Sequence, residues 1–189
     1  MNNPIRKWLL KHLEFSIFDQ LITKAQLNLG GKRLLDLACG SGYSSLLLEQ
    51  RYQPTHVVAF DLMEKQIKLA GRYPTISTDR FIGDITALGL RSNVFDVAFG
   101  FGILHHIKGW KQGVREIARV LKPGGYLVIE EPNGFSAEFF RRFVRYQIPK
   151  EGHFTFTELE DQFQSAGLQI INFKSVLLPC FRAYLLQKL

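Results

Sequence analysis

The stretch that decides the fold is Arg33-Leu34-Leu35-Asp36-Leu37-Ala38-Cys39-Gly40-Ser41-Gly42. Its first five residues form a short, mostly apolar run, which predicts a buried β-strand. The small residues that follow let the backbone turn sharply and approach a ligand closely, where a β-carbon would collide. A helix that starts after Gly42 would offer unpaired N–H groups to the same ligand. A Gly-x-Gly loop alone is weak evidence, because ordinary turns also use glycine.

Similar apolar runs recur along the chain and alternate with helical patterns. Most runs are continuous rather than alternating, as expected when both faces of a parallel sheet are covered. The predicted strands are Arg33–Leu37, His56–Phe60, Ile76–Ile82, Phe95–Phe101, Tyr126–Glu130 and Leu168–Phe173, with a further strand in the tail from Cys180 to Leu189. Strand and helix alternating at this spacing predict an α/β fold with a doubly wound sheet.

The helical patterns include a long one before the first strand. Apolar residues at four-residue intervals from Ile5 to Ala25, joined by Trp8, Phe18 and Ile22, predict one helix of roughly six turns with a single broad apolar stripe. Two more stripes carry Met63, Ile67 and Ala70, and Trp110, Val114, Ile117, Ala118 and Leu121. Thr157 is predicted to cap a last helix that ends at Gly167.

Acidic residues stand at the ends of the next two predicted strands. Asp61 follows the second strand, nineteen residues after Gly42, and Asp84 follows the third. A doubly wound sheet binds its ligands outside the carboxyl ends of the strands. Asp61 there can accept both hydroxyls of a ribose, while Asp84 accepts an adenine amino group and Ile85 donates its backbone N–H to the ring. These positions indicate an adenosine ligand without naming it, because NAD-binding proteins use the same device.

Five stretches in order resemble one family: LLDLACGSGYSS, VVAFDLMEKQIKLA, FIGDITALGL, FDVAFGFGILHHI and VLKPGGYLVIEEPN, spanning residues 34 to 133. The chain resembles a class I methyltransferase dependent on S-adenosyl-L-methionine (AdoMet), of the ubiquinone- and menaquinone-biosynthesis type (methyltransferase type 11 group). The resemblance implies a Rossmann-like, seven-stranded, mostly parallel sheet with helices on both faces, the last strand antiparallel, and an extra N-terminal helix. It also implies AdoMet as the cofactor. Ala38 departs from the family's usual glycine, and alanine is a common substitute.

From this resemblance we expect a single methyltransferase domain over residues 1–189. A helical cap (1–29) precedes the cofactor-binding core (32–131), a substrate-flanking segment (132–156) and a C-terminal helix with strands (157–189). The expected cofactor-binding residues are Asp36, Ala38, Gly40, Gly42, Asp61, Leu62, Asp84, Ile85 and Phe101. A dehydrogenase ranks far behind, because a dinucleotide fingerprint needs a third glycine where Ser45 stands.

Two interpretations stay open for several residues near this site. Asp36 either orients the loop or the methionine amino group, or it is a structural capping carboxylate. Phe101 either packs in the core or lines the sulfonium end. His106, with His105, is the candidate catalytic group, since histidine titrates in the useful range; the alternative is a pair that braces the loop. Glu130 and Glu131 close the fifth strand. One of them is expected to be buried against the loop, and a role as base is less favoured.

The composition narrows the class of protein. The chain has 189 residues, and Lys plus Arg exceed Asp plus Glu by 24 − 17 = 7. A positive net charge is typical of proteins that bind an anionic partner, such as a nucleic acid, a membrane surface or a substrate. The alternative is a small basic enzyme that has no such partner. No apolar run approaches the ~18 residues of a membrane span, and two cysteines cannot build a disulfide framework. We expect a cytoplasmic protein without a metal site, with peripheral contact at a membrane surface left open.

Three functions compete on this basis. A small-molecule or lipid-like acceptor, methylated by in-line displacement, is favoured. The segment 139–150, with four basic and no acidic side chains among aromatics, fits either a lipid or phosphate partner or a lid packed on the core. An RNA methyltransferase is less favoured, although the charge allows it, and no Asn-Pro-Pro-Tyr motif follows the fourth strand. The third is a catalytically silent partner protein with the same fold. The oligomeric state is not indicated.

Overall fold

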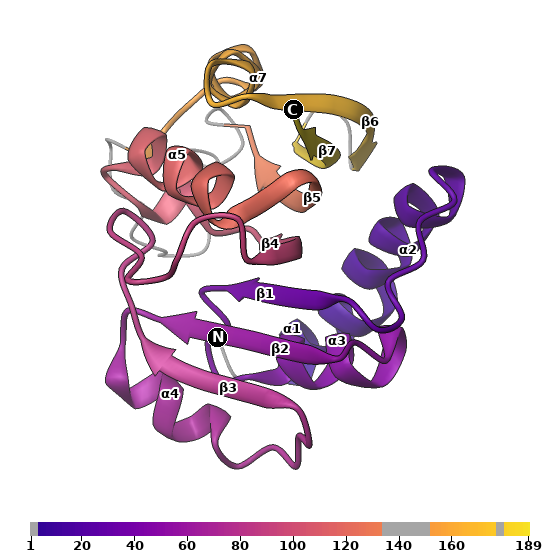
Figure 1. The fold of residues 1–189 in the computed structure, drawn as a ribbon, viewed down its shortest axis with the longest axis vertical. Coiled ribbons are helices and arrows are strands. Elements are labelled where there is room, and N and C mark those ends of the chain that lie inside the picture. Colours follow the sequence, from indigo (N-terminus) through magenta and orange to yellow (C-terminus); the bar gives the residue numbers. More distant parts are fainter. Residues whose placement is uncertain (1–3, 134–151, 177–179) are drawn as a thin grey trace.

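The seven strands of the protein form one sheet in the order β3-β2-β1-β4-β5-β7-β6 in a computed structural model, which describes residues 4–133, 152–176 and 180–189. All pairings from β3 to β5 are parallel, whereas β7 runs antiparallel to both of its neighbours. The predicted doubly wound sheet with an antiparallel last strand is confirmed (Figure 1). The strands are β1 (Arg33–Leu37), β2 (His56–Asp61), β3 (Thr78–Ile82), β4 (Phe95–Phe101), β5 (Leu121–Pro132), β6 (Leu168–Val176) and β7 (Phe181–Lys188).

Helices cover both faces of this sheet. Successive strand residues point to opposite faces, so Leu34 packs under the N-terminal helices and Leu35 under the later ones. This explains the continuous apolar runs of the sequence, since both faces are buried. The helical segments are α1 (Pro4–Leu9), the π-helical turn η1 (Leu10–Glu14), α2 (Phe15–Lys24), α3 (Tyr43–Tyr52), α4 (Glu64–Ala70), the short 3₁₀ turn η2 (Leu104–His106), α5 (Trp110–Val120) and α7 (Phe156–Ser165).

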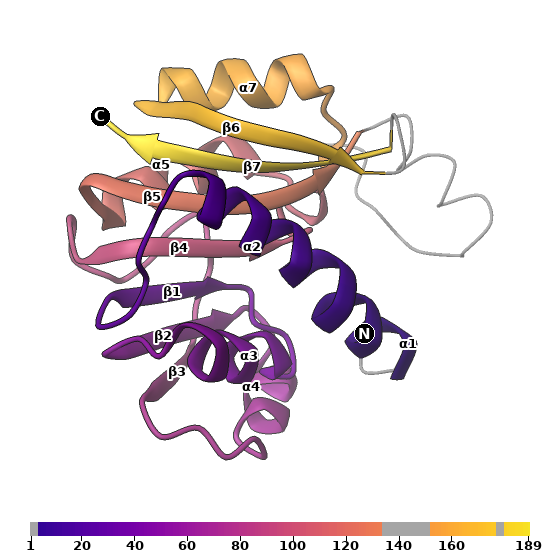
Figure 2. The same cartoon turned by 90° about the vertical axis from the view of Figure 1, so that its right-hand side faces the viewer.

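The N-terminal helix differs from the predicted single stripe. α2 crosses one face of the sheet obliquely (Figure 2) and buries five apolar side chains, whereas α1 buries none. Ile5, Trp8 and Leu13 are 71%, 60% and 39% exposed. The π turn between the two helices is wider than an α-helical turn, so residues spaced four apart on either side of it no longer share a face. The predicted helix of roughly six turns runs from Pro4 to Lys24, but its predicted single apolar stripe is interrupted at the π turn.

Smaller differences concern the ends of elements. The cap of α7 is Thr155 rather than Thr157, because Thr155 and Glu158 form a reciprocal capping box. β3 begins at Thr78, and Ile76 lies outside it, 99% exposed. β5 is longer than predicted, because it begins at Leu121 and ends at Pro132. Its early start includes the Lys122–Gly125 turn, where the register with β4 shifts. Among the described residues, no helix combines the length and the apolar character needed to cross a bilayer.

Candidate active site

The loop after β1 is fastened to the end of β2 by backbone hydrogen bonds. The N–H of Cys39 donates to Phe60 O at 2.8 Å, and the N–H of Gly40 donates to Oδ2 of Asp61 at 3.0 Å. Ala38 has a φ of +50°, which is unfavourable for a residue with a β-carbon and explains why glycine suits this position. Gly42 has a φ of +85°, and an added β-carbon there would lie 2.6 Å from Cβ of Ala70. The loop therefore needs a glycine at position 42.

Asp36 supports this loop from beneath. It has no solvent exposure, and its Oδ2 accepts hydrogen bonds from the hydroxyls of Ser44 and Ser45 at 2.7 and 2.6 Å. Burial raises the pKa of this carboxyl to about 6, against the lowering effect of the two hydroxyls. The side chain thus holds the first turn of α3, as one of the two interpretations expects. Contact with a methionine amino group stays a prediction.

Asp61 and Asp84 border a large cavity at the carboxyl ends of β2, β3 and β4. The cavity has a volume of about 730 Å³, and its lining includes Ile85, Ile103 and His106. Asp61 is 6% exposed; each of its oxygens accepts one backbone N–H, from Gly40 at 3.0 Å and from Met63 at 2.8 Å. Because a carboxylate oxygen can accept two hydrogen bonds, each retains capacity for a hydroxyl of a ligand.

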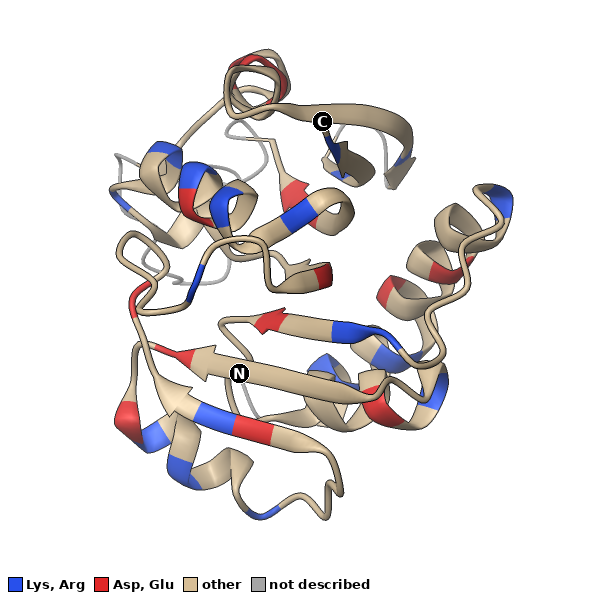
Figure 3. Ribbon diagram, in the orientation of Figure 1, with Lys and Arg blue, Asp and Glu red and all other residues tan. Residues whose placement is uncertain are grey.

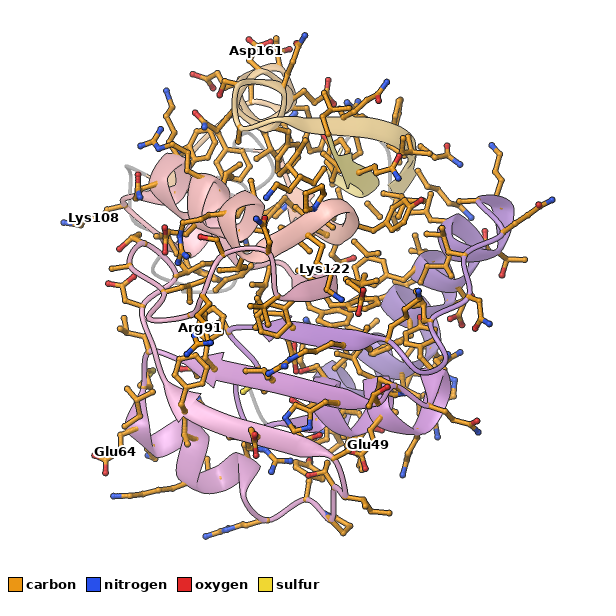
Figure 4. All side chains as sticks on the ribbon, in the orientation of Figure 1. Glu49, Glu64, Arg91, Lys108, Lys122 and Asp161 are labelled. Atoms are coloured by element: carbon orange, nitrogen blue, oxygen red, sulfur yellow. The ribbon has the colours of Figure 1, made fainter. Side chains whose placement is uncertain are left out.

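Asp84 lies at the exposed rim of this cavity. Its Oδ1 accepts both the N–H and the hydroxyl of Thr86 at 2.8 Å, so the carboxylate shapes the turn after β3. Lys108, on the opposite rim, extends outward from the loop before α5 (Figure 4). Leu62 and Met63, 66% and 54% exposed, add apolar surface beside the rim.

A second, smaller cavity of about 80 Å³ lies on the other side of Ala38, which lines both. Its floor is the glycine loop with Tyr43, its wall includes Phe101, and Arg6 and Lys7 of α1 contribute to its lining. The two cavities together fit AdoMet. The larger provides carboxylates and apolar surface for a nucleoside, and the smaller provides backbone N–H groups and cations for an amino acid.

The two adjacent histidines have different surroundings. The rings are 3.8 Å apart between centroids, and only His106 lines the large cavity. His105 has its Nδ1 2.8 Å from Oε2 of Glu131, which has no solvent exposure. Burial, followed by the neighbouring His105, lowers the pKa of His106 to about 4. His106 is therefore neutral near pH 7, and His105 is the one held against the loop.

Glu130 at the end of β5 is buried beside Glu14 of η1, a pairing that was missed in the sequence. Glu130 and Glu14 are both 8% exposed, and Glu14 forms an ion pair with Arg6. Burial, then the charge of Glu14 and a hydrogen bond with it, raise the pKa of Glu130 well above its ordinary value. The π turn brings Glu14 into this position, and a π turn leaves no clear signal in a sequence.

The structure also places other residues near the site. Cys39 is buried, and burial raises the pKa of its thiol, so it is no nucleophile. Phe101 packs against Phe15 and Phe18 with centroids 5.0 Å apart in each pair, so it is both a core residue and part of the small cavity. Nε2 of His153 is buried without a hydrogen-bond partner in the described residues. The basic segment 139–150 lies outside the described residues.

Comparisons with known proteins agree with this geometry. The family model described as a methyltransferase domain matches residues 35–129. A phthiotriol/phenolphthiotriol dimycocerosates methyltransferase of Mycobacterium leprae is 32% identical over 106 residues, covering 56% of this chain and 39% of that protein. A demethylmenaquinone methyltransferase of Listeria monocytogenes is 33% identical over 136 residues, covering 66% of this chain and 56% of that protein. This chain thus spans less than two thirds of either relative.

Solved structures share the fold over nearly the whole chain. A methyltransferase of Mesorhizobium loti, described as dependent on S-adenosylmethionine, has a TM-score of 0.76 at 17% identity, covering 90% of this chain and 98% of its own. A structure described as a complex between the Haloferax volcanii Trm112 methyltransferase activator and the putative methyltransferase gives a TM-score of 0.77 at 15% identity, covering 96% and 92%. At these identities the likeness establishes the architecture.

Proposed function

This chain belongs to the class I AdoMet-dependent methyltransferases of the methyltransferase-domain family, and from that premise we propose that it methylates a small, lipid-like acceptor. The observation that carries the proposal is the pair of cavities joined at Ala38, one bordered by Asp61 and Asp84 and the other by the glycine loop. AdoMet, when bound, supplies an electrophilic methyl group on its sulfonium.

The cofactor residues take distinct roles in this proposal. Asp61 accepts the ribose hydroxyls, Asp84 accepts the adenine amino group, and the N–H of Ile85 donates to the ring. Leu62 covers the adenosine from the rim, where its side chain is 66% exposed. Ala38, Gly40 and Gly42 give the backbone the close approach that the amino-acid end requires, and Phe101 lines the sulfonium end.

His106 is our candidate for the group that faces the acceptor. It lines the large cavity, and its neutral imidazole can accept a hydrogen bond from an acceptor hydroxyl and so orient it. The larger part of the rate enhancement comes from alignment of the acceptor with the methyl group, which is worth up to ~7–11 kcal/mol. Removal of water by the apolar lining adds to this. Mutation of His106 is therefore expected to slow the reaction without abolishing it.

The lipid-like acceptor is supported by two observations. The named substrates of the related proteins, demethylmenaquinone and the phthiotriol dimycocerosates, are quinone or lipid-like molecules. In this chain, Leu62, Met63 and Ile82 add exposed apolar side chains near the ends of β2 and β3, at 66%, 54% and 55% exposure. An acceptor with a long apolar part would contact such a surface favourably.

Peripheral contact with an anionic membrane extends the same proposal. The outer side of α1 and η1 exposes Ile5 and Trp8 beside the exposed Lys11. Apolar and basic side chains on one helix are typical of an interfacial segment. Such a contact would bring a membrane-dissolved acceptor to the site.

The alternatives have less support. Among the residues drawn in Figure 3, Lys and Arg are interspersed with Asp and Glu over several elements rather than gathered into one basic stripe, which gives an RNA acceptor no specific surface. A catalytically silent protein would have no need to keep Gly42 and Asp61, which hold the loop in a ligand-binding form.

The test is incubation with AdoMet carrying a labelled methyl group and a fractionated cell extract. We expect label in the lipid fraction, and none there with the Asp61→Ala variant. Label that enters RNA or protein instead would overturn the lipid-like acceptor but not the enzymatic activity. Absence of AdoMet binding by calorimetry would overturn both.

A further inference from the structure

The roof of the small cavity comes from the N-terminal helix, outside the β-sheet core that holds the glycine loop. Arg6, Lys7 and Leu10 line this cavity together with Gly40 and Ser41. We propose that Lys7 binds the carboxylate of AdoMet's methionine end, so that α1 is a lid which closes on the cofactor. The proposal rests on the proposed function, because it assigns a residue to that same cofactor site.

The contacts that the structure shows for Lys7 are with aromatic rings. Its Nζ lies 5.6 Å from the ring centroid of Tyr43 and 5.5 Å from that of Tyr73. Among the described residues, no carboxylate forms an ion pair with Lys7, whereas its neighbour Arg6 is paired with Glu14. A cation–π contact at an exposed site is worth only ~0.5–1 kcal/mol. A carboxylate from a ligand would be a stronger partner, at ~1.5–3 kcal/mol per charge-assisted bond.

The backbone on the glycine-loop side of the cavity also has the polarity that attracts a carboxylate. α3 has ten residues and starts at Tyr43, directly after the loop, so the N–H groups of its first turn point toward the cavity side of the loop. The positive end of the helix dipole adds to their attraction for an anion. The hydroxyls of Ser44 and Ser45 are engaged by Asp36 on the other side. A carboxylate between loop and roof would thus meet backbone donors below and Lys7 above.

The two ends of the N-terminal helical segment differ in how much of their surface is buried. Phe15 and Phe18 anchor the start of α2 on Phe101, and Glu14 joins the helix to Glu130 of β5. α1 buries no side chain. Besides its connection to η1, it is held by the ion pair of Arg6 with Glu14 and by the cation–π contacts of Lys7. Segments with few buried contacts open at low free-energy cost. An added contact between Lys7 and the cofactor would therefore stabilise the closed position of α1.

Calorimetry with two ligands tests this assignment. AdoMet and decarboxylated AdoMet differ only in the carboxylate, so their affinity ratio isolates its recognition. We expect the wild-type chain to bind AdoMet at least about tenfold more tightly, and Lys7→Met to lose that preference by weakening AdoMet alone. Lys7→Arg should restore it. Lys11→Met is the matched control, because Lys11 is exposed on the next turn and lines neither cavity, and it should behave as wild type.

The outcomes separate this inference from the proposed function. If the wild type binds AdoMet and Lys7→Met keeps the full preference for the carboxylate, or weakens both ligands equally, the role of Lys7 is wrong and the cofactor site stands. If the wild type binds neither ligand, the cofactor site and the role of Lys7 are both wrong. A second readout is limited proteolysis near α1, where AdoMet should slow cleavage of the wild type and decarboxylated AdoMet should protect it less.

Discussion

The carboxylate of Glu131 lies 2.8 Å from Nδ1 of His105, and its Oε1 accepts the backbone N–H groups of Ile103 and Leu104 at 2.9 and 2.7 Å. One fully buried side chain at the end of β5 therefore organises the loop that carries both histidines. The sequence placed His105 and His106 together as catalytic candidates. The structure gives His105 a positioning role through Glu131 and leaves His106 at the cavity.

Replacement of Glu131 tests this positioning. Glu131→Ala removes the acceptor of the buried N–H of Leu104 and of the part-buried N–H of Ile103, and the partner of the His105 ring. A buried donor without an acceptor costs ~1–3 kcal/mol, so we expect a clear fall in the thermal unfolding midpoint and in kcat. Glu131→Gln keeps one acceptor oxygen and should recover part of both. The measurements are thermal unfolding followed by circular dichroism and steady-state methyl transfer. If Glu131→Ala unfolds like the wild type, the carboxylate does not organise the loop.

Asp61 is predicted to contribute more to cofactor binding than to folding. Asp61→Ala removes the proposed ribose contact as well as the acceptor for Gly40, so AdoMet affinity measured by calorimetry should fall at least about tenfold. Glu64→Ala is the control, since Glu64 is an exposed carboxylate that pairs with Lys68 on α4 and lines neither cavity. An unchanged affinity in Asp61→Ala would remove the ribose assignment.

The sequence predicted the architecture and the strand ends because these depend on local patterns. The sequence shows directly the apolar run of β1, the glycines after it and Asp61. In the structure, all of them lie at the positions that the pattern predicted. Asp84 was also located correctly, at the rim of the cavity. Their roles toward the cofactor remain predictions.

What the sequence did not reveal depends on contacts between distant elements. The π turn before Phe15 changes which residues of the N-terminal helix face the sheet, and periodicity cannot detect one widened turn. The sequence therefore did not predict that Glu14 lies against Glu130, more than a hundred residues later. Thr155 was overlooked as a cap although Glu158 three residues later is a usable signal.

The carboxyl pair of Glu14 and Glu130 predicts a specific dependence of stability on pH. The folded-state pKa of Glu130 is raised, so its proton stabilises the folded state at low pH, and this contribution is lost as pH rises through the raised pKa. Arg6, Glu14 and Glu131 are the charged groups that act on it. In Glu130→Gln, the amide can still donate a hydrogen bond to Glu14, but it does not titrate.

We therefore expect the unfolding free energy of the wild type to fall relative to Glu130→Gln as pH increases above about 4.5, the ordinary pKa of the carboxyl. Because Asp36 titrates in both proteins, its effect cancels in the difference. Urea unfolding at a series of pH values measures that difference. Curves that stay parallel across the series would contradict the raised pKa of Glu130.

Gly42 is predicted to be irreplaceable for the loop. Gly42→Ala places a β-carbon 2.6 Å from Cβ of Ala70 at a φ of +85°. The left-handed conformation alone costs ~1–2 kcal/mol for a residue with a β-carbon, and the clash adds to this, so urea unfolding should show a lower midpoint. Gly89→Ala is the control, because nothing lies within 4 Å of the added carbon there. Equal midpoints for the two variants would show that the loop can relax without loss.

Association with anionic vesicles is expected to depend on the exposed side of the N-terminal helix. Ile5 and Trp8 are 71% and 60% exposed, and Lys11 is exposed beside them. Burial of an apolar side chain at an interface and attraction of lysine to anionic lipid, about 1 kcal/mol per charge, should act together. Sedimentation with phosphatidylserine-containing vesicles should therefore decrease in the Trp8→Ala and Lys11→Met variants and at high salt. Ile76→Ser is the matched control, because Ile76 is 99% exposed but belongs to the turn before β3. A chain that fails to sediment with these vesicles at low salt, or one in which Ile76→Ser reduces binding as much as Trp8→Ala, would exclude this helix as the membrane contact.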